Sequence, residues 1–386
     1  MNKKYIHEKG QYFTKNLFLK ESVFNLILNS PSVILEPSIG RGDLVDYTKE
    51  RNPNVEFDLY EIDENIPILN SIDRTQIVYG DFLTKDISKQ YHTIIGNPPY
   101  VKTSSGNMYI DFIDRCYELL HEGGELIFIV PSDFIKLTGS SQLINKMMTE
   151  GTFTHIIHPN NESLFEDASI DVIVFRYCKD KLLPKKIVVN GKVKFLINTN
   201  GILTFSETEQ VNSNVFSEYF DIYVGMVTGK EEVFKNNTHG NIDVLNGKNT
   251  IDKYILLQSF PTENDDINEY MLSHKSLLIS RKIKKFNDNN WFEWGALRNY
   301  ETIKQNWGKD CIYVSNITRS NEVCFKGKVQ YFGGGLIIMI PKKKVNIDNL
   351  INYINSETFK TNYMYSGRFK IGHKQLSNAL LNIPSN

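Results

Sequence analysis

The tetrapeptide Asn97-Pro98-Pro99-Tyr100 combines residue types that suit chemistry on a planar amino group. Two successive prolines fix the backbone and remove two amide donors, so a stiff chain presents its carbonyl groups. The Asn97 side-chain oxygen and the Pro98 carbonyl could accept the two hydrogens of an NH2 group, while Tyr100 offers a stacking face. Such acceptors favour methyl transfer to the nitrogen without a strong base. A proline-rich turn with a surface tyrosine is the alternative.

Short apolar runs alternate with helical stretches around this tetrapeptide. Strands are predicted at residues 33–35, 55–62, 77–79, 91–95 and 126–130, where β-branched and aromatic residues are bounded by turn residues. Helices are predicted at residues 44–51, 66–72 and 108–120, the last ending at Gly123-Gly124. Repeated strand-helix-strand units favour an α/β fold with a Rossmann-like, doubly wound and mostly parallel sheet. Ligands of such sheets bind at the carboxyl ends of the strands, where the tetrapeptide lies.

Acidic and small residues follow the first three predicted strands, which lead into Glu36-Pro37-Ser38-Ile39-Gly40-Arg41-Gly42-Asp43, Tyr60-Glu61-Ile62-Asp63 and Gly80-Asp81-Phe82. A dinucleotide loop would need G-x-G-x-x-G, and carboxylates beside a pyrophosphate would be repulsive. S-adenosylmethionine fits better, because it has a sulfonium, an ammonium, a ribose and an adenine but no phosphate. Glu61, 25 residues after Glu36, is placed to hold ribose hydroxyls, and Asp81 and Phe82 could bind the adenine. A helix-opening turn without a ligand, with Asp81 as a cap and Phe82 in the core, is the alternative.

Taken in order, these motifs resemble the gamma-class N6-adenine DNA methyltransferases, the TaqI methyltransferase type. The resemblance covers about residues 8–180 and includes Gln11-Tyr12-Phe13-Thr14 before the first strand and Leu164-Phe165 before the run Val172 to Tyr177. It implies a class I methyltransferase fold, S-adenosylmethionine as cofactor, and methyl transfer to N6 of an adenine flipped out of duplex DNA. The implied cofactor-binding residues are Thr14, Glu36, Pro37, Gly40, Glu61, Ile62, Asp81, Phe82 and Asn97, and the implied catalytic residues at the target base are Asn97, Pro98, Tyr100 and Phe165. A core role for Phe165 is the alternative.

Charge divides the chain into an acidic and a basic part, although the formal net charge is only -1. Residues 1–180 hold 17 basic and 26 acidic residues, whereas the 116 residues after 270 hold 18 basic and 7 acidic ones. A basic module favours a polyanionic partner, and a solvated surface without a partner is the alternative. We predict a catalytic domain over residues 1–217 and a mixed α+β, DNA-recognition domain over residues 218–386. Its expected nucleic-acid-binding residues are Lys282, Arg298, Arg319, Arg368, Lys370 and Lys374.

Together with the charge distribution, the resemblance implies a site-specific methyltransferase of a restriction-modification system, which we expect to act as a cytoplasmic monomer on double-stranded DNA. Its 386 residues suffice for two domains, and no apolar run reaches the roughly 18–20 residues of a membrane span. The four cysteines are far apart, so neither a metal site nor a disulfide is expected. A cognate restriction endonuclease would be a second partner. Alternatives are methylation of an RNA base, a protein glutamine amide or cytosine N4, or a catalytically inactive DNA-binding specificity subunit.

Overall fold

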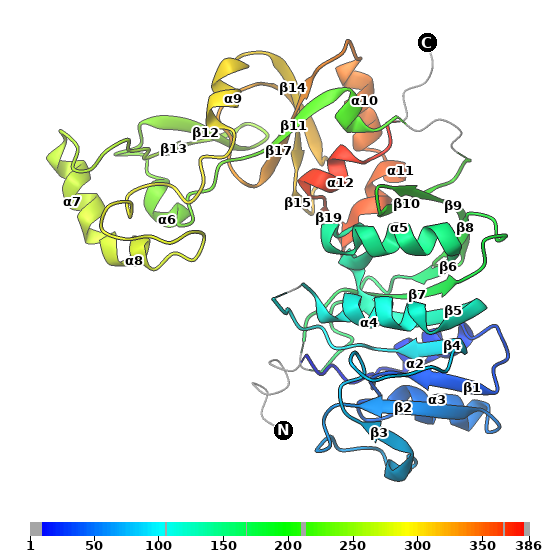
Figure 1. Ribbon diagram of the computed structural model, residues 1–386. Helices are drawn as coiled ribbons and strands as arrows, with labels where there is room; N and C mark the ends of the chain where they lie inside the picture. Colours follow the sequence, from blue (N-terminus) through cyan, green and yellow to red (C-terminus); the bar gives the residue numbers. More distant parts are fainter. Residues whose placement is uncertain (1–9, 105, 167, 210–213, 366, 382–386) are drawn as a thin grey trace. The chain divides into compact units, whose positions relative to one another are not determined.

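Two compact units make up the chain. The computed structural model describes residues 10–104, 106–166, 168–209, 214–365 and 367–381 (Figure 1). The first unit comprises Met1–Asn212 with Tyr365–Gly367, and the second comprises Ser213–Met364 with Arg368–Asn386. The expected assignment of catalysis to residues 1–217 and of DNA recognition to residues 218–386 stays a prediction.

One large sheet forms the centre of the first unit. Its ten strands are β1 (Val33–Glu36), β2 (Glu56–Glu61), β3 (Ile77–Tyr79), β4 (Tyr91–Gly96), β5 (Leu120–Pro131), β6 (Thr152–Ile157), β7 (Val172–Cys178), β8 (Lys186–Val189), β9 (Lys192–Thr199) and β10 (Ile202–Ser206). They lie in the order β10-β9-β8-β6-β7-β5-β4-β1-β2-β3. Strands β1 to β5 are parallel to their neighbours among themselves, and β7 runs antiparallel to both β5 and β6. The sheet is therefore doubly wound and parallel in the half that holds the predicted motifs.

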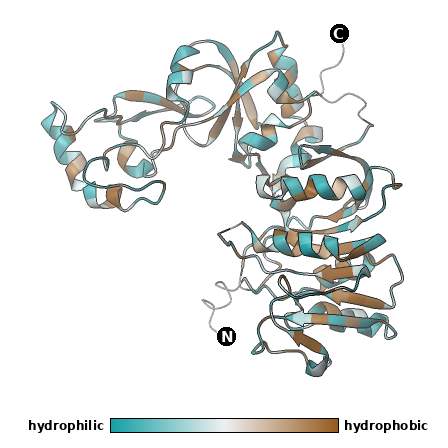
Figure 2. Ribbon diagram, viewed as in Figure 1, coloured by the Kyte–Doolittle hydropathy of each residue, from teal (hydrophilic) through white to brown (hydrophobic). Residues whose placement is uncertain are grey.

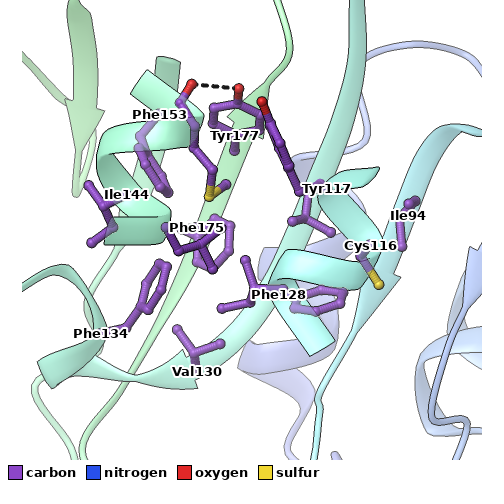
Figure 3. Close-up of a cluster of buried hydrophobic side chains, with 14 of the residues drawn as sticks. Ile94, Cys116, Tyr117, Phe128, Val130, Phe134, Ile144, Phe153, Phe175 and Tyr177 are labelled. Atoms are coloured by element: carbon purple, nitrogen blue, oxygen red, sulfur yellow. Dashed lines mark hydrogen bonds between the residues drawn. The ribbon is translucent and has the colours of Figure 1, made fainter. Parts of the chain in front are cut away.

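Helices cover both faces of this sheet. Leu126, Phe128 and Val130 of β5 pack on one face with α4 (Met108–Glu118) and α5 (Ser141–Glu150). Ile127 and Ile129 pack on the other with α2 (Leu17–Asn25) and α3 (Asp43–Arg51). Alternate residues of a strand point to opposite faces, so a strand buried on both faces is apolar along its length. Figure 2 shows hydrophobic residues concentrated along these strands, and Figure 3 shows the cluster around Phe128.

Two sequence predictions in this unit are wrong. Residues 66–72 form no helix but an irregular segment, although Ile66 and Ile72 are buried. Gly123 and Gly124 do not end a helix; they lie inside β5. Tyr91 of β4 pairs with Leu120 and Thr93 pairs with Glu125, so the residues between form a bulge. Gly123 has φ +75° there, a conformation that glycine adopts without strain.

The second unit is a mixed α+β structure. A four-stranded antiparallel sheet has the order β11 (Phe220–Val224), β17 (Leu336–Pro341), β14 (Asp310–Ser315) and β16 (Cys324–Lys328). Smaller sheets are formed by β12 (Ile242–Gly247) with β13 (Thr250–Tyr254), and by β15 (Ile317–Thr318), β19 (Arg368–Lys370) and β18 (Met364–Tyr365). The helices are α6 (Glu231–Phe234), α7 (Asp265–Ser273), α8 (Lys275–Ile279), α9 (Tyr300–Gln305), α10 (Ile347–Ile354), α11 (Glu357–Lys360) and α12 (His373–Ser377).

Across the described parts of both units, no helix combines the length and the apolar character that crossing a membrane requires.

Candidate functional site

The carboxyl ends of β1 to β4 meet where the order of the strands reverses. From β1 the chain continues to β2 and β3 on one side, whereas β4 and β5 lie on the other side of β1. Loops that leave such neighbouring strands diverge and create a crevice for a ligand. A cavity of about 330 Å³ lies here. Its lining residues are Gly10, Gln11, Tyr12, Phe13, Pro37, Ser38, Gly40, Glu61, Ile62, Ile66, Gly80, Asp81, Phe82, Leu83, Asn97, Pro99, Val101, Met108 and Phe112.

Most of the predicted cofactor-binding residues line this cavity, namely Pro37, Gly40, Glu61, Ile62, Asp81, Phe82 and Asn97. Thr14 and Glu36 line a smaller cavity of about 30 Å³. The two cavities share Tyr12, Phe13, Ser38, Gly40 and Asn97. Residues that are up to 83 positions apart in sequence therefore surround one region at the edge of the sheet. That they bind a cofactor stays a prediction.

The Glu61 carboxylate is held in place by three backbone N–H groups. Gly40 donates to Oε2 at 2.9 Å, and Ile62 and Asp63 donate to Oε1 at 2.9 and 3.0 Å. Burial raises the pKa of Glu61 above its ordinary value, although these three hydrogen bonds act in the opposite direction. A carboxylate has about four lone-pair directions, so it retains acceptor capacity toward the cavity.

Glu36 is a second carboxyl group at this edge and is only 2 % exposed. Its Oε1 accepts a hydrogen bond from the Ser38 N–H at 3.2 Å. Burial raises the pKa of Glu36 to about 8, and the negative charge of Glu61 contributes in the same direction. A positive charge nearby would favour the ionised form of Glu36, whereas a phosphate would favour its protonated form. The electrostatics of the site thus favour a ligand with cationic groups.

Two buried polar atoms near the cavity lack a hydrogen-bond partner in the described part of the chain. They are Ser38 Oγ and Gln11 Oε1, and both residues line the cavity. The Gln11 Nε2 donates to Asp63 Oδ2 at 3.3 Å, which leaves its oxygen on the other side of the amide. Buried polar groups are normally hydrogen-bonded, so these atoms indicate a polar ligand. Among the described residues, no group of three or more His, Cys, Asp and Glu side chains is placed to hold a metal ion.

Asp81 and Phe82 have the structural roles that the sequence offered as alternatives, and both also line the cavity; that they bind the adenine stays a prediction. The Asp81 Oδ1 accepts a hydrogen bond from the Leu83 N–H at 3.0 Å, as a turn-capping residue does, and its side chain is exposed beside the cavity. Phe82 is 2 % exposed and stacks on Phe112 with ring centroids 5.6 Å apart. Its ring is thus part of the core and of the cavity wall at once.

The Asn97 side chain connects the end of β4 to the segment that precedes α2. Its Nδ2 donates to the Tyr12 carbonyl at 2.7 Å and to Thr14 Oγ1 at 3.0 Å. This contact fixes the orientation of the amide, because an oxygen in the place of Nδ2 would face the Tyr12 carbonyl. Oδ1 consequently points toward Tyr100, whose hydroxyl donates to it at 2.5 Å and also lies 3.0 Å from the Ile129 carbonyl.

Three aromatic rings pack together beside Asn97. Tyr12 stacks on Tyr100 with centroids 5.5 Å apart, and Phe165 lies 5.8 Å from Tyr12 and 6.3 Å from Tyr100. Phe165 is 5 % exposed and packs with the core on the α2 and α3 side of the sheet. Burial raises the pKa of Tyr100 well above its ordinary value, so its hydroxyl stays protonated. The structure therefore brings Asn97, Pro98, Tyr100 and Phe165 together, and their catalytic role stays a prediction.

Several lining residues were not singled out by the sequence. Phe13 and Tyr12 belong to the motif before the first strand, of which only Thr14 was selected. Met108 and Phe112 are four residues apart on α4, in a stretch that the sequence predicted as a helix without assigning it to the site. The spacing was a usable signal, because it places both side chains on the helix face that meets the ends of the strands.

The six basic residues predicted to bind DNA fall into two groups in the second unit. The first group lies around the antiparallel pair of β15 and β19, in which Ile317 is paired with Lys370. It consists of Arg319, Arg368 and Lys370, with Lys374 in α12. Lys282 and Arg298 lie elsewhere, in exposed loops. The loop of Lys282 is anchored by Arg281, whose guanidinium donates to the carbonyls of Thr228, Trp291 and Glu293.

The strand order and the place of the cavity define a Rossmann-like fold with a doubly wound sheet, which confirms the predicted fold class. The fold is similar to that of the Type IIL restriction-modification enzyme MmeI in complex with DNA, with a TM-score of 0.59 at 11 % identity over 95 % of this chain and 64 % of that chain. The structure of a DrdV–DNA complex is similar with a TM-score of 0.51 at 12 % identity, over 90 % of this chain and 50 % of that one.

Residues 12–165 match the Eco57I restriction-modification methylase family. The Type II methyltransferase M.HincII of Haemophilus influenzae is 29 % identical over 221 residues, which are 52 % of this chain and 43 % of that protein. The modification methylase CviBIII of Paramecium bursaria Chlorella virus NC1A is 33 % identical over 146 residues, 32 % of this chain and 38 % of that protein. Each match thus spans less than half of the relative. Residues 12–165 are thus similar to restriction-modification methylases, in agreement with the family resemblance of the motifs.

Proposed function

We propose that this protein is a DNA methyltransferase of a restriction-modification system that methylates N6 of an adenine held outside its duplex. The observation that carries the proposal is the Asn97 amide, which is anchored through its nitrogen and directs its oxygen toward Tyr100, beside a cavity with acidic walls. The relatives are named as Type II methyltransferases and a modification methylase, and the MmeI structure of similar fold is a complex with DNA, which supports a DNA substrate. Residues 1–217 would be the catalytic domain and residues 218–386 the target-recognition domain.

S-adenosylmethionine is the cofactor that fits the cavity. When bound, it supplies an electrophilic methyl group on a sulfonium. Glu36 and Glu61 would provide negative charge for its cationic groups and acceptors for its ribose. Ser38 Oγ and Gln11 Oε1, which have no hydrogen-bond partner among the described residues, would be further acceptors. Asp81 and Phe82 would hold the adenine. A volume of about 330 Å³ is within the ~300–1,000 Å³ that small-molecule sites usually have.

At the target base, the residues of the tetrapeptide act as fixed acceptors. Asn97 Oδ1 and the Pro98 carbonyl would accept the two hydrogens of the exocyclic amine and so favour a pyramidal nitrogen with an available lone pair. Tyr100 can give up its hydrogen bond to Asn97 at this point, because its hydroxyl also lies 3.0 Å from the Ile129 carbonyl. No strong base is required, since the proton can leave for water after methyl transfer. Fixed dipoles of this kind are each worth about 2.7–4 kcal/mol of transition-state stabilisation.

One assay tests the proposal directly. The protein is incubated with S-adenosylmethionine carrying a labelled methyl group and with duplex DNA of mixed sequence, and the product is digested to nucleosides. We expect labelled N6-methyladenine. Label in N4-methylcytosine, or label only when RNA or protein replaces the DNA, would contradict the proposal, and DNA binding without any label would identify an inactive specificity subunit.

Asn97→Ala tests the role of the amide in the chemistry. We expect kcat to fall by about 10²–10³, because a fixed acceptor for the developing charge is lost. The variant also loses the bonds to Tyr12 and Thr14, so cofactor affinity should be measured in parallel. Thr14→Val is the matched control, since it removes one of these bonds and leaves Oδ1 in place. We expect it to weaken cofactor binding and to change kcat less than about threefold. An Asn97→Ala enzyme with unchanged kcat would remove Asn97 from the reaction.

A further inference from the structure

Phe165 is carried by a loop whose two ends are joined by polar side chains. The loop begins at His158, directly after β6, and ends at Asp171, directly before β7. These two strands are antiparallel neighbours in the sheet. Between its ends the loop doubles back on itself, because Phe165 and Ala168 form a β-bridge and the Ile170 N–H donates to the Glu162 carbonyl at 3.0 Å.

The ends of the loop meet at the Asp171 carboxylate, which is completely buried. His158 Nε2 lies 2.9 Å from both Oδ1 and Oδ2, and it must carry the proton because a carboxylate only accepts. Ser132, the first residue after β5, donates its hydroxyl to Oδ2, and its N–H donates to the Asp171 carbonyl at 3.0 Å. We call Ser132, His158 and Asp171 the clasp. It ties both ends of the loop to the end of the strand that neighbours β4.

Closing a loop with a buried carboxylate has a large cost in free energy, because the charge must be removed from water. Apolar residues of similar volume would close the same loop without that cost. A charged, hydrogen-bonded group has one well-defined geometry, however, and therefore fixes the path of the chain more narrowly than apolar packing does. The clasp thus suits a loop whose tip must be held in one position.

The tip of this loop lies against the candidate target-base side of the site. Phe165 contacts the rings of Tyr12 and Tyr100, and its neighbour Glu166 forms an ion pair with Lys15. Tyr12 in turn holds Asn97 through its carbonyl. A shift of the loop would therefore move the aromatic face that Phe165 presents next to Asn97.

We infer that Ser132, His158 and Asp171 are positioning residues, which hold Phe165 where it packs against the target base. This inference rests on the proposed function, because it assigns Phe165 to base capture. The clasp touches neither the base nor the cofactor, so loosening it lowers base capture and leaves cofactor binding unchanged.

Base capture can be measured with 2-aminopurine in place of the adenine that the labelling assay identifies. Its fluorescence rises when it leaves the base stack. His158→Ala removes a donor from Asp171 at a site that is only partly buried, and His158→Gln restores an N–H donor. Tyr177→Phe is the matched structural control, because it removes a buried hydrogen bond of 2.8 Å to the Met147 carbonyl elsewhere in the same unit (Figure 3). Phe165→Ala and the double variant His158→Ala/Phe165→Ala complete the set.

We expect His158→Ala to weaken base capture about tenfold, at unchanged affinity for S-adenosylmethionine, and His158→Gln to recover most of it. The double variant should be no weaker than Phe165→Ala alone, because the clasp acts through Phe165. Tyr177→Phe should lower the Tm without changing the fluorescence. Additive losses in the double variant, or a His158→Ala protein that resembles Tyr177→Phe, would overturn the inference. If the wild-type protein raises no fluorescence, or Phe165→Ala captures the base normally, the proposed role of Phe165 fails first and the inference with it.

Discussion

Asn97 is engaged on both sides of its amide before any ligand binds. Its nitrogen is held by Tyr12 and Thr14, and its oxygen already accepts a hydrogen bond from Tyr100. An incoming amine therefore has to compete for Oδ1 with a hydroxyl that has a second acceptor in the Ile129 carbonyl. Tyr100 thus keeps Asn97 satisfied in the free protein, a role that its residue type did not reveal.

Tyr100→Phe and Tyr100→Ala separate the ring of this residue from its hydroxyl. Phenylalanine keeps the stacking face and removes only the competitor for Oδ1, so we expect kcat to change less than about fivefold. Alanine also removes the stacking face, which is worth about 1–3 kcal/mol per base, so we expect DNA affinity to fall about tenfold or more. Steady-state kinetics and DNA binding measure the two effects. Equal losses in both variants would show that the hydroxyl, and not the ring, is what matters.

Glu36 makes the stability of the ligand-free protein depend on pH. Its pKa in the folded protein is about 8, above the ordinary value of 4.5, because the side chain is buried. The folded state therefore binds more protons than the unfolded state between these two values, and stability falls as the pH rises through this window, by at most about 1.4 kcal/mol per pH unit. Glu36→Gln should remove this component of the pH dependence. Urea denaturation at pH 6 and pH 8 measures it, and an identical pH dependence in both proteins would contradict the assignment.

At the scale of elements, a buried ion pair joins α2 to the sheet. Glu125 of β5 is completely buried and accepts a hydrogen bond from Arg176 Nε of β7 at 2.8 Å. It also accepts from Thr93 Oγ1 at 2.9 Å and from the N–H groups of Leu28 and Asn29, which follow α2. One carboxylate thus satisfies donors from two strands and from the end of a helix.

Glu125→Gln is expected to lower the free energy of unfolding by about 3–5 kcal/mol, because it leaves the Arg176 charge buried without its partner. Asp114→Asn is the surface control. It breaks an exposed ion pair with Lys146 of 2.9 Å and should cost less than about 1 kcal/mol. Denaturant unfolding compares the two variants, and equal costs would show that the buried pair adds nothing beyond a surface one.

The sequence predicted the parallel strands well, because each is a short apolar run bounded by turn residues. It failed where tertiary packing competes with local spacing. The segment with Ile66 and Ile72 has apolar residues near helical spacing, but Pro67 lacks an N–H and Arg74 donates to the Ile66 carbonyl at 2.8 Å. Likewise, nothing in the sequence indicates that Asn97 is held by Tyr12, because that bond joins residues 85 positions apart.

At the scale of the whole molecule, the basic residues of the second unit should set the salt dependence of DNA binding. Replacing Arg319, Arg368 and Lys370 by alanine should reduce the slope of log K against log salt by up to about 0.9 for each phosphate contact that is lost. Lys326→Ala/Lys328→Ala is the control, since these lysines of β16 are paired with Asp348 and Asp310. Binding titrations at several salt concentrations give the slopes. A slope that responds only to the control pair would place the DNA on another surface.

The order of strands in the large sheet also bears on how the nascent chain acquires its shape. Each strand from β2 to β5 has a neighbour in the sheet that is synthesised before it. These neighbours are β1 for β2, β2 for β3, β1 for β4 and β4 for β5. β6 has no such neighbour, because β7 and β8, which lie beside it, both follow it. Translation delivers about 5–20 residues per second, so this strand waits with unpaired edges until its partners emerge. The half of the sheet that holds the cavity can therefore form by the addition of one strand after another, before the second unit has been translated.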